Sequence, residues 1–197
     1  TMVVDEKLES LRQASHEDVG GILHLIEPFE NDGTLVKRSR TEIERDIGQY
    51  TVVEHDGVIF ACAALYPYPE NRTGEMAALT VSPQSQGQGD GEKVLKRIEQ
   101  QARAQGLDSI FVLTTRTMHW FLKRGFTPVD LEWLPEARKR DLAFAAAAGV
   151  LGGYTLDFSD VTTGILLDPA NTALDDRAEA PHGELSQWAE HHAVRVR

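Results

Sequence analysis

The sequence has a single cysteine, Cys62, so it cannot form an intrachain disulfide. This fits a reducing compartment, and we interpret Cys62, in the apolar run VIFACAAL, as a small buried apolar residue. No stretch reaches the ~18 consecutive apolar residues that a membrane-spanning helix needs. No charged-then-apolar leader opens the chain either. We therefore expect a cytoplasmic protein without a membrane partner.

Basic residues are scarce as well. The 197 residues include 20 Lys or Arg against 31 Asp or Glu, which gives a net charge of −11. Such a charge argues against a nucleic-acid partner. It also makes the basic segment TLVKRSR, residues 34–40, stand out as a place that attracts anions. The length suits one domain with an appendage, or two small domains.

Apolar periodicity predicts two helices in the first quarter of the chain. One covers roughly residues 16–30 and begins at the capping pattern formed by Ser15 and Asp18. The other covers roughly 41–50, with Thr41 as its cap. Two β-rich runs then meet at Asp56-Gly57, a strong hairpin signal. A further strand, TGEMAALTVSP, is stopped by Pro83.

The middle of the chain alternates helical and strand patterns. The amphipathic segment EKVLKRIEQQARAQG predicts a long helix that ends at Gly106. The apolar run DSIFVLTT is typical of a central buried strand. RTMHWFLKRG predicts a short helix ended by Gly125, and FTPVD a short strand. The order β-α-α-β-β-β-α-β-α-β predicts an α/β fold with a mixed central sheet flanked by helices.

The composition changes after about residue 140. An Ala/Gly-rich stretch, LAFAAAAGVLGG, leads into an acidic segment without strong periodicity. We therefore expect a domain at 8–140 and an atypical C-terminal extension at 141–197, whose role the sequence does not indicate. The extension holds His182, His191 and His192, but their spacing matches no common metal site. We predict no bound metal.

A glycine-rich loop, QGQGDG at residues 86–91, lies between a predicted strand and a predicted helix. Its spacing does not fit the dinucleotide fingerprint G-x-G-x-x-G, and the chain has no Gly-Lys-Ser/Thr as in nucleoside triphosphate loops. It fits Q/R-x-x-G-x-G/A, in which backbone amides and a helix N-terminus face a pyrophosphate. The alternative is a flexible surface turn.

Six segments, one of which contains this loop, resemble a known family. TVSPQSQGQGDGEKVLKRIE resembles the acetyl-CoA-binding motif of the GCN5-related N-acetyltransferases. DVGGILHLIEPFENDGTLVKRSR, VVEHDGVIFACAALYPYP, GEMAALTVSP and IFVLTTRTMHWFLKRGF resemble the acetyltransferase domain of the bacterial N-acetylglutamate synthases, and LPEARKR matches that family's next segment. The resemblance covers roughly residues 8–140. It implies the GCN5-related N-acetyltransferase fold, acetyl-CoA as co-substrate and L-glutamate as acceptor in the first step of arginine biosynthesis.

The donor side of such a site is assigned mainly to backbone groups. Holding acetyl-CoA falls to the loop amides of Gln86, Gly87, Gly89 and Gly91. The resemblance implies that the strand from Leu79 to Val81 lies against the pantetheine arm. It also implies that a backbone N–H of that strand polarises the thioester carbonyl.

The acceptor side is assigned to side chains. Glu75, at the start of the strand that runs into the loop, is the candidate base; the alternative is a solvated residue at a strand end. The resemblance favours the hydroxyl of Thr117 for protonating the leaving thiolate, with His119 as the other choice. Positive charge for the carboxylates of glutamate comes from the basic turn that precedes the second helix. We expect Arg38 first, then Lys37 and Arg40, with Arg116 as a weaker candidate.

Two departures from the family leave alternatives open. The family's closing basic strand, of the type YNWQRRSKVL, supplies an arginine and a serine to the glutamate site, and here the chain runs into DLAFAAAAGVLGG instead. The chain could therefore act on another small amine or amino acid, or bind acetyl-CoA without activity. The family also usually carries an upstream kinase-like domain that binds arginine. Without this domain we expect no inhibition by arginine. We keep a homo-oligomer as one of the alternatives for the assembly of the protein.

Overall fold

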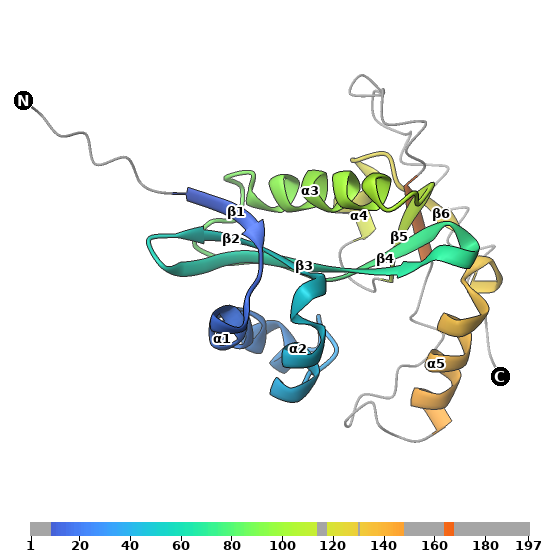
Figure 1. The fold of residues 1–197 in the computed structure, drawn as a ribbon, viewed down its shortest axis with the longest axis horizontal. Coiled ribbons are helices and arrows are strands. Elements are labelled where there is room, and N and C mark those ends of the chain that lie inside the picture. Colours follow the sequence, from blue (N-terminus) through green and yellow to red (C-terminus); the bar gives the residue numbers. More distant parts are fainter. Residues whose placement is uncertain (1–8, 114–117, 130, 148–163, 168–197) are drawn as a thin grey trace, which may run out of the picture. The chain divides into compact units, whose positions relative to one another are not determined.

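The computed structural model describes residues 9–113, 118–129, 131–147 and 164–167 (Figure 1). It divides into two compact units, and strands β3 (Val58–Tyr68) and β4 (Thr73–Val81) contribute residues to both. The first unit comprises residues up to 66 together with 76–105, and the second comprises 67–75 and the residues from 106 onward. Each unit is described by itself.

The first unit is built on antiparallel strands. β1 (Glu9–Gln13) pairs with β2 (Tyr50–His55), and β2 pairs with β3. The turn between β2 and β3 has positive φ at both Asp56 (51°) and Gly57 (79°), as expected of the Asp-Gly hairpin signal. The predicted hairpin is confirmed.

Helices cover both faces of these strands. α1 (Val19–Asn31) and α2 (Arg40–Asp46) lie on one face, and α3 (Asp90–Ala104) lies on the other (Figure 1). Alternation along β2 explains this, because Val52 belongs to the buried cluster with α1 and α2, whereas Thr51 contacts Gln101 of α3. The main apolar residues of that cluster come from both helices, from the 3₁₀ turn Ile47–Gln49, and from β2 and β3: Val19, Ile22, Leu25, Ile26, Ile43, Ile47, Tyr50, Val52, Ile59 and Cys62.

Two helix starts show how local chemistry sets the boundaries. Ser15 and Asp18 form the predicted capping box, at a 3₁₀ turn (His16–Asp18) that leads into α1. The predicted cap of α2 is wrong by two residues. Ser39, not Thr41, is the N-cap, because its backbone is extended and its hydroxyl accepts the amide of Glu42, whose side chain caps Ser39 in return.

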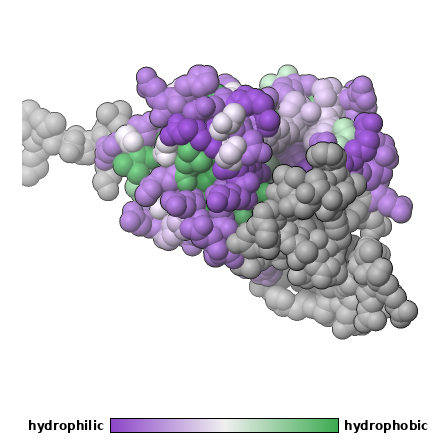
Figure 2. Space-filling view, turned by 90° about the horizontal axis from the view of Figure 1, so that it is seen from below, coloured by the Kyte–Doolittle hydropathy of each residue, from purple (hydrophilic) through white to green (hydrophobic). Residues whose placement is uncertain are grey.

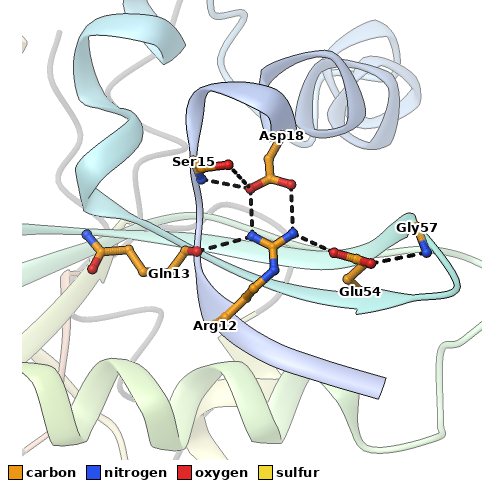
Figure 3. Close-up of polar contacts among 6 residues, drawn as sticks. All are labelled: Arg12, Gln13, Ser15, Asp18, Glu54 and Gly57. Carbon is orange, nitrogen blue, oxygen red and sulfur yellow. Dashed lines mark hydrogen bonds and ion pairs between the residues drawn. The ribbon is translucent and has the colours of Figure 1, made fainter. Parts of the chain in front are cut away.

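An arginine joins the first strand to its neighbours. Arg12 of β1 donates to both carboxylate oxygens of Asp18, at 2.7 and 2.9 Å, and to Glu54 of β2 (Figure 3). Asp18 also accepts the amide of Ser15 at 2.7 Å. The network ties β1, β2 and the start of α1 together through charge-assisted hydrogen bonds.

The second unit holds the start of β4, which pairs in parallel with β5 (Ser109–Leu113). β7 (Gly164–Leu167) pairs antiparallel with both β5 and β6 (Thr127–Val129). The helices are α4 (Met118–Leu122) and α5 (Glu136–Ala147). Gly125, after α4, has the positive φ (87°) of a helix stop, as predicted.

The element order up to β6 is the predicted one. Two elements go beyond it: α5 crosses the predicted boundary at residue 140, and β7 lies within the segment 141–197. No helix in the described part of the chain is long and apolar enough to cross a membrane. In the space-filling view the described surface is mostly hydrophilic, with small hydrophobic patches (Figure 2).

Candidate active site

The glycine-rich loop leads directly into α3. Gly87 (φ 81°) and Gly89 (φ 88°) adopt left-handed conformations, and Gly89 is the N-cap of α3. No atom lies within 4 Å of the place where a Cβ of either glycine would project, so their role is conformational. The first backbone bond of the helix runs from Lys93 N to Gly89 O, at 3.0 Å. The amides of Asp90 and Gly91 therefore precede the helical ladder, as anion-binding amides do.

The loop is held by its own short contacts. Ser85, which is buried, donates its amide to the carbonyl of Ser82 at 2.9 Å, and Gln88 donates its amide to Ser85 O at 3.1 Å. The side chain of Gln86 donates to the carbonyl of Val81 at 3.4 Å. These bonds fix the loop while Gln86 and Gly87 stay exposed to solvent.

β4 carries a conformational exception just before the loop. Ala78, buried at 5% exposure, has φ 55°, a left-handed value that a non-glycine residue rarely adopts within a strand. Its carbonyl accepts from Thr80 Oγ1 at 3.0 Å and from Cys62 Sγ at 3.6 Å. This left-handed residue interrupts the regular strand conformation in the middle of β4. Strained backbone of this kind is concentrated at functional sites.

The single cysteine is one of the two side chains that donate to the carbonyl of Ala78. Cys62 is fully buried, as predicted, and burial raises the pKa of its thiol to about 12. The thiol is therefore protonated at physiological pH and suited to the hydrogen bond with Ala78 O.

Arg38 is positioned by the end of α1. Its backbone amide donates to Glu30 Oε1 at 2.9 Å, and its guanidinium donates to the carbonyl of Val36 at 3.2 Å. The pKa of Asp46 is lowered by a hydrogen bond from Arg45 and, to a smaller extent, by the charge of Arg38. Within the described residues, the Arg38 guanidinium makes no ion pair with a carboxylate, so its charge is available to a ligand.

The other two basic candidates differ from Arg38. Lys37 is exposed. Arg40 is exposed and pairs with Glu44 one turn along α2, at 3.2 Å. All three lie in the first unit with the glycine loop and Leu79 and Val81.

Glu75 belongs to the second unit and is 5% exposed. It is not a solvated strand end. Both of its carboxylate oxygens accept from Arg138 of α5, with Nε–Oε2 at 2.5 Å and Nη2–Oε1 at 3.1 Å. Sequence reasoning missed Arg138, although it lies in the LPEARKR segment, because no spacing relates it to a residue 63 positions away.

The aromatic residues around Glu75 give it an apolar setting. Phe111, its partner on β5, lies between Tyr68 and Trp133, with ring centroids 6.0 Å away in each case. Burial and the negative charge of Glu75 raise the pKa of the Tyr68 hydroxyl to about 12. Tyr68 therefore stays protonated and can donate a hydrogen bond.

The candidates for the leaving-group side are only partly described. Thr117 and Arg116 lie outside the described residues. His119 is exposed; Phe121 is buried at 3% exposure, and Trp120 is partly buried with the Arg124 guanidinium 3.7 Å above its ring. No group of three or more His, Cys, Asp or Glu in the described ranges could hold a metal ion, and the three C-terminal histidines lie outside those ranges.

Comparison with known proteins identifies the family. Residues 9–126 match the acetyltransferase (GNAT) family, and the chain belongs to it. The predicted fold is therefore confirmed. The chain is 61% identical over 140 residues to the amino-acid acetyltransferase of Ralstonia nicotianae and 49% identical over 140 residues to that of Escherichia coli. Each match covers 71% of this chain and about a third of the relative, 31% and 32% respectively.

A solved structure gives the same picture. N-acetylglutamate synthase from Neisseria gonorrhoeae, complexed with coenzyme A and N-acetyl-glutamate, is similar with a TM-score of 0.71 and 36% identity. The similarity covers 83% of this chain and 36% of that one. The chain thus corresponds to about a third of the length of these relatives.

Proposed function

We propose that the chain transfers the acetyl group of acetyl-CoA to the α-amine of L-glutamate. The observation that carries this is the coincidence, in one chain, of a preformed amide-lined loop at α3, a strained strand residue before it, and a buried carboxylate at Glu75. The names of the relatives support the acceptor. The proposal extends to cytoplasmic location and to the first step of arginine biosynthesis.

The donor side rests on backbone groups. Acetyl-CoA supplies an acetyl thioester that is already activated for attack by an amine. We assign its diphosphate to the amides of Gln86, Gly87, Gly89 and Gly91, because glycines there leave the backbone open and the helix adds its positive end. We assign the pantetheine arm to the strand from Leu79 to Val81, where the bend at Ala78 frees the next amide to polarise a carbonyl.

The acceptor side rests on side chains. Glu75 accepts a proton from the ammonium of glutamate, so that the free amine can attack the acetyl carbon. Arg38 binds a carboxylate of glutamate through its guanidinium, which makes no ion pair with a described carboxylate, and Lys37 and Arg40 add positive charge. Thr117 gives its hydroxyl proton to the sulfur as the C–S bond breaks, and the second proton of the attacking amine restores that hydroxyl. The two protons lost by the amine therefore go to Glu75 and to the thiol.

A second function is favoured by one observation. β7, the strand that pairs with β5 and β6, has the sequence Gly-Ile-Leu-Leu. It contains neither the arginine nor the serine that the resemblance implies for a glutamate site. We therefore keep a small amine or amino acid other than glutamate as the alternative acceptor.

The test is a CoA-release assay with acetyl-CoA and a panel of amines that includes L-glutamate. Glutamate-dependent release is expected. Arg38→Ala should raise KM for glutamate about 10- to 100-fold, the value of a charge-assisted pair, and Glu75→Gln should lower kcat by about 10²-fold or more. Arg103→Ala, which removes one exposed positive charge at the far end of α3, should change neither. Release with another amine but not glutamate would favour the alternative, and acetyl-CoA binding without any release would refute both.

A further inference from the structure

The carboxylate of Glu75 is held by a fork of hydrogen bonds from Arg138. The two side chains are largely buried, with 7% of the Glu75 side chain and 24% of the Arg138 side chain exposed. Each oxygen of the carboxylate accepts one N–H of the guanidinium. This bidentate geometry fixes both the position and the rotation of the carboxylate, which a single donor would not do.

The other polar groups near Glu75 do not replace this cation. Tyr68 of β3 and Asp141 of α5 are the titratable groups that act on the pair from its surroundings. Tyr68 is neutral, and Asp141 is exposed and negative. Phe111, the β5 partner, is apolar. Among the described residues, Arg138 is therefore the one positive charge in contact with Glu75.

The fork leaves Glu75 able to accept a proton. A carboxylate offers about four lone-pair positions, and Arg138 occupies two of them. The fork thus keeps the carboxylate of Glu75 aimed while part of its accepting capacity stays open.

We propose that Arg138 is a positioning residue that orients the carboxylate of Glu75 as the base for the acceptor amine. The inference rests on the proposed function, in which Glu75 takes one proton from the acceptor ammonium. Arg138 itself gains and loses no proton in this step, because arginine stays protonated throughout.

The test compares Arg138→Met, Arg138→Lys and the matched control Arg140→Met, an exposed arginine on the same helix. In Arg138→Met kcat should fall about 10-fold or more, with KM for acetyl-CoA unchanged, because the carboxylate loses the fork that aims it. Arg138→Lys should recover part of kcat but not all of it, since lysine keeps the charge but cannot make the fork.

Opposite results overturn the inference. They are a wild-type kcat in Arg138→Met or a wild-type kcat in Arg138→Lys. If Arg138→Met does not fold, the Lys variant still decides, because it keeps the charge and loses only the orientation. Arg140→Met should match wild type throughout, and an equally lowered kcat in this control would also refute a specific role for Arg138.

A second readout needs no turnover and separates the two proposals. The side-chain carboxylates are labelled with ¹³C-glutamate and observed by NMR, with Glu75→Gln identifying the Glu75 signal. The Glu75 signal should change its chemical shift in Arg138→Met relative to wild type, because the carboxylate loses both N–H donors. An unchanged signal overturns the inference, whereas a changed signal in a protein that acetylates no amine overturns the proposed function alone.

Discussion

Asp90, the first residue of α3, places its buried carboxylate 3.4 Å from Nε2 of His55, the last residue of β2. The other oxygen of Asp90 lies 3.4 Å from Lys93 Nζ. A negative charge at a helix start stabilises the helix, but here the same place is proposed to hold a diphosphate. Lys93 offsets that charge and His55 lies beside the carboxylate, so the loop can remain attractive to an anion.

This arrangement predicts that substitutions of Asp90 and His55 change the affinity for CoA in opposite directions. Asp90→Asn should tighten CoA binding about 3- to 10-fold, the effect of one screened charge near the protein surface. His55→Gln should weaken it, because the carboxylate loses a partner. Isothermal titration with CoA measures both, and pantetheine, which lacks the diphosphate, serves as control. Equal changes for CoA and pantetheine would show that the substitutions act on the loop's folding and not on its charge.

The positive φ of Ala78 predicts that valine at this position lowers stability and kcat more than valine at the adjacent Ala77. A β-branched side chain tolerates this conformation poorly, so Ala78→Val should lower the free energy of unfolding by about 1–3 kcal/mol. It should also lower kcat, because an extended backbone returns the Leu79 amide to the strand. Ala77, partly buried with an ordinary negative φ, is the control, and Ala77→Val should cost less than about 1 kcal/mol. Urea unfolding measures the stability and steady-state kinetics measure kcat. Similar losses of both in the two variants would contradict a special role for the backbone conformation of Ala78.

Most of the fold could be predicted from the sequence because its signals are local. The Asp-Gly turn, the Ser15–Asp18 cap and the glycine stops each depend on a few neighbouring residues. The cap of α2 was misplaced from Ser39 to Thr41 because both residue types can cap, and only the backbone conformation selects between them.

The site was less predictable, because its key relationships are not local. Glu75 could be proposed from its segment, but its partner Arg138 is brought to it only by the packing of α5. The strained conformation of Ala78 cannot be recognised from the sequence, because alanine also occurs in regular strands. β7 was missed because its four residues have no pattern of their own and form a strand only by pairing with β5 and β6.

The Arg12 network predicts stability that depends on pH. The hydrogen bonds from Arg12 are the largest cause of the lowered pKa of Asp18. Burial acts in the opposite direction and raises this pKa. A lowered pKa in the folded state means that the stabilisation is present above the ordinary aspartate value, near 3.9, and is lost as pH falls below it. Wild type should therefore lose stability steeply below about pH 4, and Asp18→Asn should flatten this dependence.

The same network predicts that removing the Arg12 guanidinium lowers the free energy of unfolding. Arg12→Met leaves Asp18, with 8% of its side chain exposed, without its main partner. The loss should be about 1–3 kcal/mol, less than for a fully buried pair because Arg12 itself is 35% exposed. Glu44→Ala, which breaks the exposed Arg40 pair, should cost less than about 0.5 kcal/mol. Equal losses in urea unfolding would mean that the network does not hold β1 in place.

Two consecutive glycines of α1 give the last prediction. A Cβ on Gly21 would lie 2.8 Å from Cγ1 of Ile59 on β3, closer than packed atoms can approach, whereas a Cβ on Gly20 would meet only the tip of Arg40 at 3.8 Å. Gly21→Ala should therefore push α1 away from the strand and cost about 1–3 kcal/mol.

Gly20→Ala should instead stabilise the protein by up to about 1 kcal/mol, since alanine favours a helix over glycine and nothing obstructs it. The two substitutions add the same methyl group one residue apart, so composition and unfolded-state effects cancel in the comparison. Thermal or urea unfolding should move the two variants in opposite directions. Stabilisation of both would mean that α1 does not pack against β3 as closely as its backbone indicates.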